Sequence, residues 1–371
     1  MLEITNLRDG AVLDHRSGCE TDDYLEITVE GIADPQSAVK VNDIATLRHD
    51  RNFSAKVRLT EKINRITVVS DDYFGVKTLT ITVLWDKKSF PRYNFFFDDC
   101  IFALRSVAKN RPASVFDEMF LGRLKKINSL YGTKFILNLF YNDDHHKDFN
   151  LSDMPDTYKT EFQANADWLR FSFHAYSEFP DRPYQNASKE KLAADFDLIC
   201  DEVCRFAGKE CFIAPQVIHW AMTNPENFSV LKDRGVKFLS GGFLGCKTSL
   251  TEEHSVQVTD IAYHYEKDVA YYVCDKAVMY DRYYDLLLMP GMVCCNFDDI
   301  PTLKKKFAAL AAAPRDVVCL MTHEQYSYPD YFNYIPDHLD RIEAACRLAY
   351  EAGLKPTWLS YGVFGNESWG K

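Results

Sequence analysis

Titratable side chains follow several apolar runs that have the composition of buried strands. The run "NFFF" ends in Asp98 and Asp99, and "WLRFSF" is followed by His174. A later run, "VVCLMT", is followed by His323 and Glu324. In folds built on parallel strands, functional side chains emerge at the carboxyl ends of the strands and gather at one edge of the sheet. We therefore expect these residues, which are distant in sequence, to form one site.

Asp98 and Asp99 are adjacent carboxylates at the end of an apolar run, which is unfavourable without a compensating charge. The segment that follows them supplies its first base only at Arg105. A divalent cation is a natural partner for such a pair, and histidine and carboxylate side chains are common further ligands. The segment "HAYSE" contains both, as His174 and Glu178. The pattern indicates a site for one divalent metal ion, with zinc as the first expectation and cobalt, nickel or manganese as alternatives.

Helical and strand-like segments alternate along the larger, second part of the chain. Residues 114–131 place apolar side chains on one stripe of a helix, with Ser114 as its N-cap and Gly132 at its end. The apolar strand "KFILNLF" follows. The same order recurs at 188–208 before "CFIAP" and at 301–314 before "DVVCLMTHE". These repeated units predict an α/β fold with a parallel sheet covered by helices, either a barrel or a doubly wound sheet.

Residues 2–85 show a different pattern, in which short strands alternate apolar with polar residues. Examples are "YLEITVEG" and "FSAKVRLT", and Gly, Asn and Asp separate them, which predicts a β-sandwich. The order of these strands and turns resembles the bacterial immunoglobulin-like modules attached to carbohydrate-active enzymes, and the resemblance implies a packing or spacer role. We place the two domains at 1–88 and 89–371. Within the second, the Tyr- and Val-rich stretch 245–300 predicts an inserted hairpin or a longer β excursion.

The composition excludes several classes of function. Forty-three Lys plus Arg against 54 Asp plus Glu give a formal net charge of −11. Such a charge repels phosphate backbones and anionic lipids, so neither nucleic acid nor a membrane is an expected partner. The first residues, "MLEITNLRDG", do not resemble an export signal, and the 11 cysteines form no spaced framework. We expect a cytoplasmic protein, or an extracellular one if a signal had been trimmed; no oligomeric state is predicted.

Four motifs resemble those of the NodB-type polysaccharide deacetylases, also called carbohydrate esterase family four. "FFFDDC" is similar to the family's T-F-D-D-G, and "HAYSE" is similar to its H-T-Y-S-H. "IAPQVIHW" takes the place of R-P-P-x-G, and "VVCLMTHE" resembles the closing motif, a strand that ends in a histidine. The order agrees over about 89–371. The resemblance implies a deformed (β/α)7-type barrel and metal-assisted removal of N- or O-acetyl groups from sugars.

The same resemblance implies roles for individual residues. Asp98 would be the general base, and His323 the general acid that protonates the leaving amine or alkoxide. Asp99 and His174 would be metal ligands, and Glu178 would replace the family's second ligand histidine. Such a metal polarises an acyl carbonyl and lowers the pKa of its water, while the base removes a proton and the acid returns one.

The motifs also depart from the family in three places. Cys100 stands where the family has glycine, which constrains the backbone after the aspartate pair. Glu178 adds one negative charge to the ligand set, which would make the metal a weaker Lewis acid. Ile213 and Ala214 precede Pro215, so the arginine that orients the catalytic base in the family is missing. The charge state of Asp98 is therefore open.

Further polar and aromatic residues are candidates for contacts with a substrate. His219 and Trp220 follow Pro215, so His219 is a candidate ligand or second proton-transfer group and Trp220 a platform for a sugar ring. A histidine bonded to backbone beside a core tryptophan is an equally good interpretation of this pair. Tyr176 and Glu324, which lie next to the motif histidines, complete the set of expected substrate-binding residues.

The remaining histidines with a noticeable sequence context are expected outside the catalytic set. His145 and His146 lie in the polar segment "YNDDHHKDF", which predicts a solvated loop or a rim around the substrate. His254 and His264 lie in the Tyr-rich stretch and are expected at the surface or in the wall of a cleft.

Three functions fit these observations. The first is a divalent-metal-dependent hydrolase that removes acyl groups from a carbohydrate, with a deacetylase as the first expectation. The alternative is a catalytically inactive carbohydrate-binding or scaffold protein on a deacetylase-like barrel. The third is a glycosidase that uses two carboxylates, such as Asp98 with Glu178 or Glu324, and requires no metal.

Overall fold

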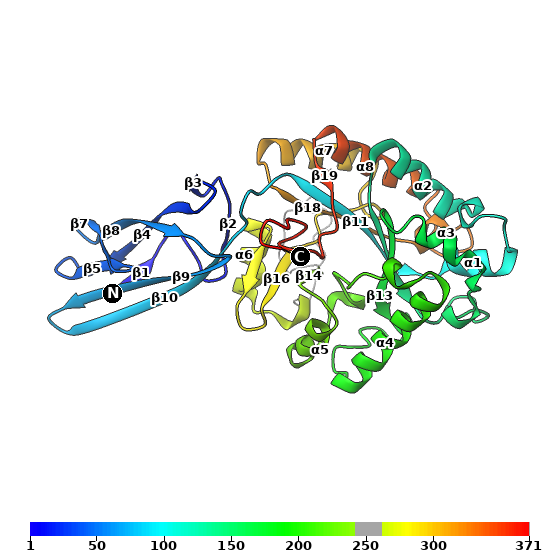
Figure 1. Cartoon of the computed structure of the whole chain (residues 1–371), viewed down its shortest axis with the longest axis horizontal. Coiled ribbons are helices and arrows are strands. Elements are labelled where there is room, and N and C mark those ends of the chain that lie inside the picture. Colours follow the sequence, from blue (N-terminus) through cyan, green and yellow to red (C-terminus); the bar gives the residue numbers. More distant parts are fainter. Residues whose placement is uncertain (242–261, 371) are drawn as a thin grey trace. The chain divides into compact units, whose positions relative to one another are not determined.

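The computed structural model describes residues 1–241 and 262–370, which form two compact units (Figure 1). The first unit comprises Met1–Phe90, Val278–Leu288 and Asn366–Lys371. The second comprises Pro91–Ala277 and Met289–Gly365. No helix in the described part of the chain is both long and apolar enough to cross a membrane.

The first unit contains two five-stranded sheets around one apolar core. One sheet has the order β1-β4-β8-β7, with β3 paired to β4, and the other has the order β2-β10-β9-β5-β6. The strands are β1 (Leu2–Ile4), β2 (Val12–Leu13), β3 (Gly18–Glu20), β4 (Leu25–Ala33), β5 (Ala38–Val41), β6 (Ile44–Ala45), β7 (Leu47–His49), β8 (Asn52–Leu59), β9 (Ile63–Asp72) and β10 (Gly75–Trp85). Alternate residues of β4 and β8 are buried, as a sheet with one face on a core requires. Two sheets enclosing one core form a sandwich, while its immunoglobulin-like identity stays an expectation.

Two later segments of the chain belong to this first unit. β15 (Met279–Asp281) and β16 (Leu286–Pro290) form an antiparallel hairpin, and the amide of Tyr280 donates to the carbonyl of Gly10 at 2.8 Å. After residue 365 the chain returns to the end of β10, where Nε1 of Trp369 donates to the carbonyl of Trp85 at 2.8 Å.

The stretch 245–300 differs in part from the predicted β excursion. Its hairpin is present as β15 and β16, but α6 (Lys267–Lys276) precedes it as a helix. The buried residues Ala270, Val273 and Cys274 have helical spacing. The spacing of the apolar residues therefore predicts this element better than the content of tyrosine and valine does. The part of the prediction that falls on 245–261, including His254, lies outside the described residues.

The second unit is built on a parallel six-stranded sheet with the order β13-β12-β11-β18-β17, in which β19 also pairs with β11. Its strands are β11 (Arg92–Cys100), β12 (Phe135–Phe140), β13 (Leu169–Ala175), β17 (Val293–Cys294), β18 (Val317–His323) and β19 (Lys355–Pro356); β14 (Phe238–Gly241) belongs to another sheet. All nine residues of β11 are buried, which explains why this strand reads as an almost continuous apolar run.

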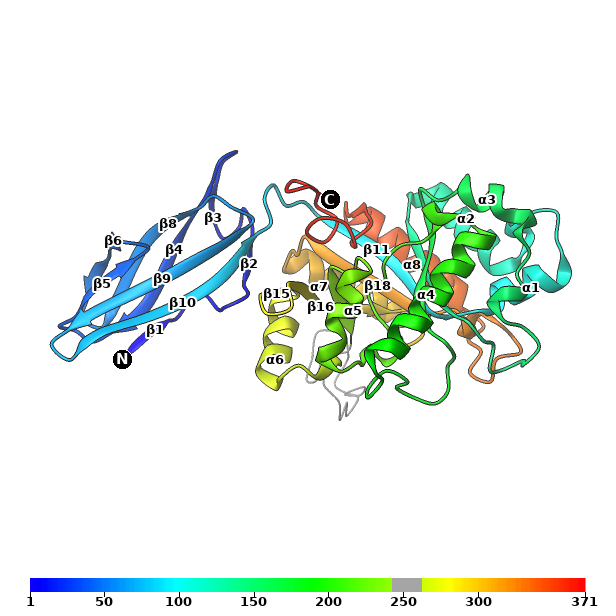
Figure 2. The same cartoon turned by 60° about the horizontal axis from the view of Figure 1, so that its bottom comes forward.

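Helices accompany this parallel sheet, as the alternating sequence predicts. They are α1 (Phe102–Asn110), α2 (Met119–Tyr131), α3 (Lys159–Gln163), α4 (Lys189–Phe206), α5 (Phe228–Asp233), α6, α7 (Ile300–Ala312) and α8 (His338–Glu351). Figures 1 and 2 show α7, α8 and α2 following one another in this order along one side of the sheet, with α4 and α5 along another. Ser114 caps a short 3-10 turn, Glu118 caps α2 itself, and α2 ends at Gly132 in the left-handed conformation.

The α/β class with a parallel sheet is confirmed, but the predicted barrel is not closed in the described part of the chain. The sequence predicts a strand at "CFIAP". This segment contributes only one parallel bridge, between Phe171 and Phe212, before the chain turns away. The sheet order places the carboxyl ends of β11, β12, β13 and β18 at one edge, where the expected site residues lie.

Candidate functional site

The two aspartates at the end of β11 face the same side because the strand is irregular there. The pairing of β11 with β12 shifts register between Phe97 and Cys100, and Asp99 has a φ of 57°. Successive side chains of a regular strand point to opposite faces, and a bulge changes that direction. As a result Oδ1 of Asp98 lies 3.7 Å from Nδ1 of His174, and Oδ1 of Asp99 lies 3.1 Å from Nε2 of the same ring. Left-handed backbone in a residue other than glycine costs on the order of 1 kcal/mol or more and is typical of functional sites.

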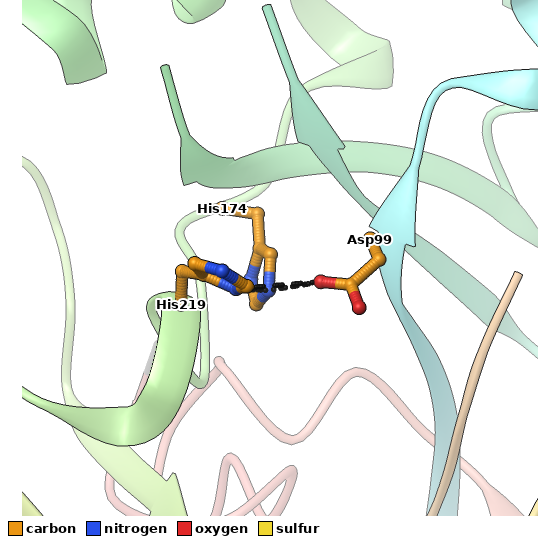
Figure 3. A group of neighbouring side chains, drawn as sticks. All are labelled: Asp99, His174 and His219. Atoms are coloured by element: carbon orange, nitrogen blue, oxygen red, sulfur yellow. Dashed lines mark hydrogen bonds and ion pairs between the residues drawn. The ribbon is translucent and has the colours of Figure 1, made fainter. Parts of the chain in front are cut away.

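Asp99, His174 and His219 bring three ligand atoms together (Figure 3). Nε2 of His174 lies 3.1 Å from Oδ1 of Asp99 and 3.1 Å from Nδ1 of His219, and the third side of the triangle, from His219 to Asp99, is 3.3 Å. Ligands bound about 2.0–2.2 Å from a tetrahedral metal lie about 3.3–3.6 Å from each other. All three side chains are buried. The triangle therefore has close to the size that a tetrahedrally coordinated divalent ion requires.

The hydrogen bond of the His219 ring to the backbone also fits a cation at this position. Nε2 of His219 lies 3.1 Å from the backbone carbonyl of Glu178, a contact in which the ring nitrogen must be the donor. The neutral ring then presents the lone pair of Nδ1 to Asp99 and His174, which is the form that binds a metal. On the other ring, Nδ1 of His174 is buried and has no hydrogen-bond partner among the described residues.

Glu178 is placed differently from the expected third ligand. Its carboxylate accepts hydrogen bonds from Nε2 of Gln325 at 2.8 Å and lies 2.6 Å from Nε2 of His145. The loop after β13 turns so that the backbone carbonyl of Glu178, and not its carboxylate, faces His219. In this geometry His219 takes the third position of the ligand triangle. A metal ligand is one of the two roles that the sequence suggests for His219.

His145 and His146 are more firmly held than a solvated loop would be. The hydrogen bond that His145 donates to the carboxylate of Glu178 raises the pKa of His145 above its ordinary value, against the opposing effect of burial. His146 lies between two carboxylates, with Nδ1 2.7 Å from Asp143 and Nε2 3.0 Å from Asp330. These contacts connect the loop after β12 with the loop after β18. A position at the rim of the site, the other expectation for these histidines, agrees with this placement.

The pKa values of the two adjacent aspartates shift in opposite directions. Burial raises the pKa of Asp98 to about 7, and the charge of Asp99 adds to this, while His323 opposes it. Burial acts on Asp99 too, but its close contacts with the rings of His174 and His219 outweigh it and hold the pKa of Asp99 well below its ordinary range. One carboxylate is therefore held charged beside the imidazoles, and its neighbour can take up a proton near neutrality.

Asn138 is a contact of Asp98 that the sequence interpretation missed. Its Nδ2 donates to Oδ1 of Asp98 at 2.7 Å from the neighbouring strand β12. A neutral amide thus orients the carboxylate, where the family resemblance implied an arginine. Asn138 is fully buried and is the one polar residue of "FILNLF". A lone polar residue in a strand that is otherwise apolar is the signal that could have identified it.

His323 lies next to the aspartate pair, at the end of β18. Its Nε2 is 3.9 Å from Oδ2 of Asp99, and its Nδ1 is 3.0 Å from Oδ1 of Asn296. Asn296 follows β17 and is buried. It too was absent from the sequence interpretation, because a neutral side chain 27 positions before its partner gives no pattern that can be read from the sequence.

Glu324 does not face the site, so its expected role in substrate binding is corrected. Its carboxylate accepts hydrogen bonds from the backbone amides of Ile101, Phe102 and Ala103 at 2.7, 2.8 and 3.0 Å. These amides begin α1 and have no partner within the helix. The side chain is 1% exposed, and burial raises its pKa to about 8 against the effect of the three amides. Glu324 is a cap supplied to α1 from a distant part of the chain.

Trp220 and Tyr176 present aromatic surface near the ligand residues. Trp220 is 50% exposed, follows His219 directly, and has the guanidinium of Arg182 4.9 Å from its ring centre. Tyr176 is 36% exposed and stacks on Tyr141 at 5.2 Å. Their contact with a substrate stays a prediction. His264 is exposed, as expected.

Comparisons with known proteins do not assign a family. No protein-family model matches the chain, and no curated protein matches it significantly. Among solved structures, a candidate α-galactosidase from Bacteroides fragilis is similar at 9% identity and a TM-score of 0.30, over 95% of this chain and 79% of that one. A Bacteroides ovatus GH5 xyloglucanase in complex with a XXXG heptasaccharide is similar at 12% identity and a TM-score of 0.29, over 96% and 93%. Similarities of this size assign neither an activity nor a substrate.

Proposed function

We propose that the protein is a divalent-metal-dependent hydrolase that removes acyl groups, acetyl in the first instance, from a carbohydrate. The observation that carries this proposal is the convergence of Asp99, His174 and His219, with Asp98 3.7 Å from His174 and His323 3.9 Å from Asp99. A ligand set of two neutral imidazoles and one carboxylate is typical of hydrolytic zinc sites. The motif resemblance to polysaccharide deacetylases supports the acyl group and the sugar as substrate.

Each residue of the site has a role in this reaction. Asp99, His174 and His219 would hold the ion, which supplies polarisation of the acyl carbonyl when bound. Asp98 removes a proton from the attacking water, a task for which a carboxylate with a pKa near neutrality is suited. His323 delivers a proton to the nitrogen or oxygen that leaves the acyl carbon. Trp220 offers an apolar platform for the face of a sugar ring.

The structure disfavours the third function considered from the sequence. A two-carboxylate glycosidase needs a second carboxyl group that is free to act on the sugar. The carboxylate of Glu324 is occupied by three backbone amides, and that of Glu178 by His145 and Gln325. Neither is placed for this work.

Release of acetate from a panel of acetylated mono- and oligosaccharides tests the proposal. We expect acetate release from metal-loaded protein, its loss after chelation, and a decrease of about 100-fold or more in Asp98→Asn, since a general base contributes about this much. Cleavage of glycosidic bonds that chelation does not affect would indicate a glycosidase. Binding of the same sugars without any product would indicate the inactive scaffold.

A further inference from the structure

The oxygen of the Asn296 side chain is surrounded by hydrogen-bond donors. Oγ1 of Thr322 donates to it at 3.1 Å and Sγ of Cys294 at 2.9 Å, and Nδ1 of His323 lies 3.0 Å away. A side-chain amide oxygen can only accept. If the oxygen occupies this position, Nδ1 of His323 must carry a hydrogen.

The contacts of His338 with Thr322 and Ser327 also agree with donation from Thr322 to the oxygen of Asn296. Oγ1 of Thr322 also lies 2.7 Å from Nε2 of His338. Since the threonine donates its single proton to Asn296, it must accept from His338, which then carries its hydrogen on Nε2. Nδ1 of His338 is left as an acceptor, and the hydroxyl of Ser327 lies 2.8 Å from it as a donor. Each of the contacts from His338 through Thr322 and the oxygen of Asn296 to His323 then joins a donor to an acceptor. Nδ2 of Asn296, on the other side of the amide, is buried and has no hydrogen-bond partner among the described residues.

We propose that Asn296 is a positioning residue that keeps a proton on Nδ1 of His323 in both the neutral and the doubly protonated ring, so that the proton that the doubly protonated ring delivers to a substrate is the one on Nε2. The buried series from His338 through Thr322 holds the amide of Asn296 in the required orientation. Nε2 of His323 is the ring nitrogen directed toward Asp99, at 3.9 Å from its Oδ2. The significance for turnover rests on the proposed function, whereas the position of the proton does not.

The reversed orientation of the same amide is the competing arrangement. With the nitrogen of Asn296 facing His323, each hydrogen bond of the series would reverse, and neutral His323 would carry its proton on Nε2. The S–H group of Cys294 would then lose its acceptor. The two arrangements give opposite tautomers, so one spectrum distinguishes them.

Nitrogen NMR of the side chains, on protein with 15N-labelled histidine and without substrate, tests the proposal directly. The His323 signals are identified by their loss in His323→Gln. We expect Nδ1 of neutral His323 to be protonated and Nε2 to be unprotonated, and the reverse tautomer would overturn the proposal. Because this measurement involves no turnover, it gives the same answer whether or not the proposed function is correct.

Variants of Asn296 test its influence on catalysis. Asn296→Leu removes the acceptor, so the signals of His323 should become those of a tautomer mixture and kcat should fall about 10- to 100-fold with KM unchanged. Asn296→Asp retains an acceptor oxygen and should restore the Nδ1–H tautomer. The matched control is Asn227→Leu, since Asn227 is an equally buried amide that contacts Ala187 and Thr223. It should leave the His323 signals unchanged.

A weaker variant keeps the proposal testable if Asn296→Leu does not fold. Thr322→Val has nearly the same shape but removes the hydroxyl between Asn296 and His338. We expect a smaller change in the same direction, with part of His323 in the other tautomer. An unchanged His323 spectrum in Thr322→Val, together with an unchanged kcat, would show that the series does not position His323.

Discussion

Asp98 and His323 are directly paired positions of two neighbouring parallel strands, β11 and β18. The amide of Glu324, the next residue, donates to the carbonyl of Asp98 at 3.0 Å and extends the pairing by one step. Neighbouring strands lie about 4.8 Å apart, so the backbone ladder itself fixes the separation of the proposed base and acid. His219, in contrast, comes from a short 3-10 turn. The two groups that move protons are therefore held by the sheet, and one of the proposed ligands by a loop.

Glu324→Ala tests the structural role of the residue beside His323. We expect the free energy of unfolding to fall by at least about 2 kcal/mol, because three buried amides at the start of α1 lose their acceptor. Glu324→Gln should lose less, since its amide oxygen still accepts. Denaturant unfolding of the metal-free protein measures both.

The control for this experiment is Glu351→Ala, which removes an exposed carboxylate at the end of α8. Its free energy of unfolding should stay within about 0.5 kcal/mol of the wild type. An equally stable Glu324→Ala protein would mean that the amides of α1 find other partners.

Trp220→Ala tests the proposed contact with the sugar. We expect KM for an acetylated oligosaccharide to rise about 5-fold with a smaller change in kcat, because loss of a stacking partner costs about 1 kcal/mol. Tyr350→Ala removes an aromatic side chain that is similarly exposed, at 59%, on α8. It should not change KM; equal effects of both substitutions would exclude a specific role for Trp220.

The buried carboxyl of Asp98 predicts a pH dependence of stability in the metal-free protein. The pKa of Asp98 is about 7 in the folded state and near its ordinary value of 3.8 in the unfolded chain. The folded protein thus retains a proton that the unfolded chain releases, so this stabilisation is complete below pH 3.8 and is lost as the pH rises through 7.

The comparison with Asp98→Asn isolates this effect, because the amide does not titrate. Between pH 5 and pH 8 the wild type should lose up to about 3 kcal/mol of stability relative to Asp98→Asn. Unfolding curves of both proteins over this pH range provide the measurement. A difference that does not change with pH would show that Asp98 is ionised throughout.

The sequence was sufficient for the parts of the site that lie on regular strands. A buried parallel strand reads as an apolar run, and the residue after it lies at the sheet edge, so Asp98, Asp99, His174 and His323 could be identified. The alternation of side-chain direction along a strand explains the error at Glu324. Successive residues at the end of a strand point to opposite sides, so a residue next to a site histidine is directed away from it.

Features that depend on loops and on neutral side chains could not be predicted. His219 reaches the triangle because Trp220 and Ala221 adopt positive φ values of 64° and 48°, which no spacing rule reveals. The turn that brings the carboxylate of Glu178 to His145 is likewise not indicated by any spacing in the sequence. Asn138 and Asn296 carry no charge, so their burial requires no compensating charge, and the sequence gives no reason to single them out. The open sheet escaped prediction because the alternation of helices and strands is common to barrels and open sheets.

Metal content of the purified protein tests the central claim most directly. Wild type, His219→Ala and Glu178→Gln would be purified without added metal, exchanged into buffer with excess zinc, dialysed, and analysed by mass spectrometry of the elements. The ligand triangle of Asp99, His174 and His219 predicts about one zinc ion per chain in the wild type and in Glu178→Gln, and a loss in His219→Ala. A wild type without metal, or retention in His219→Ala with loss in Glu178→Gln, would contradict the account.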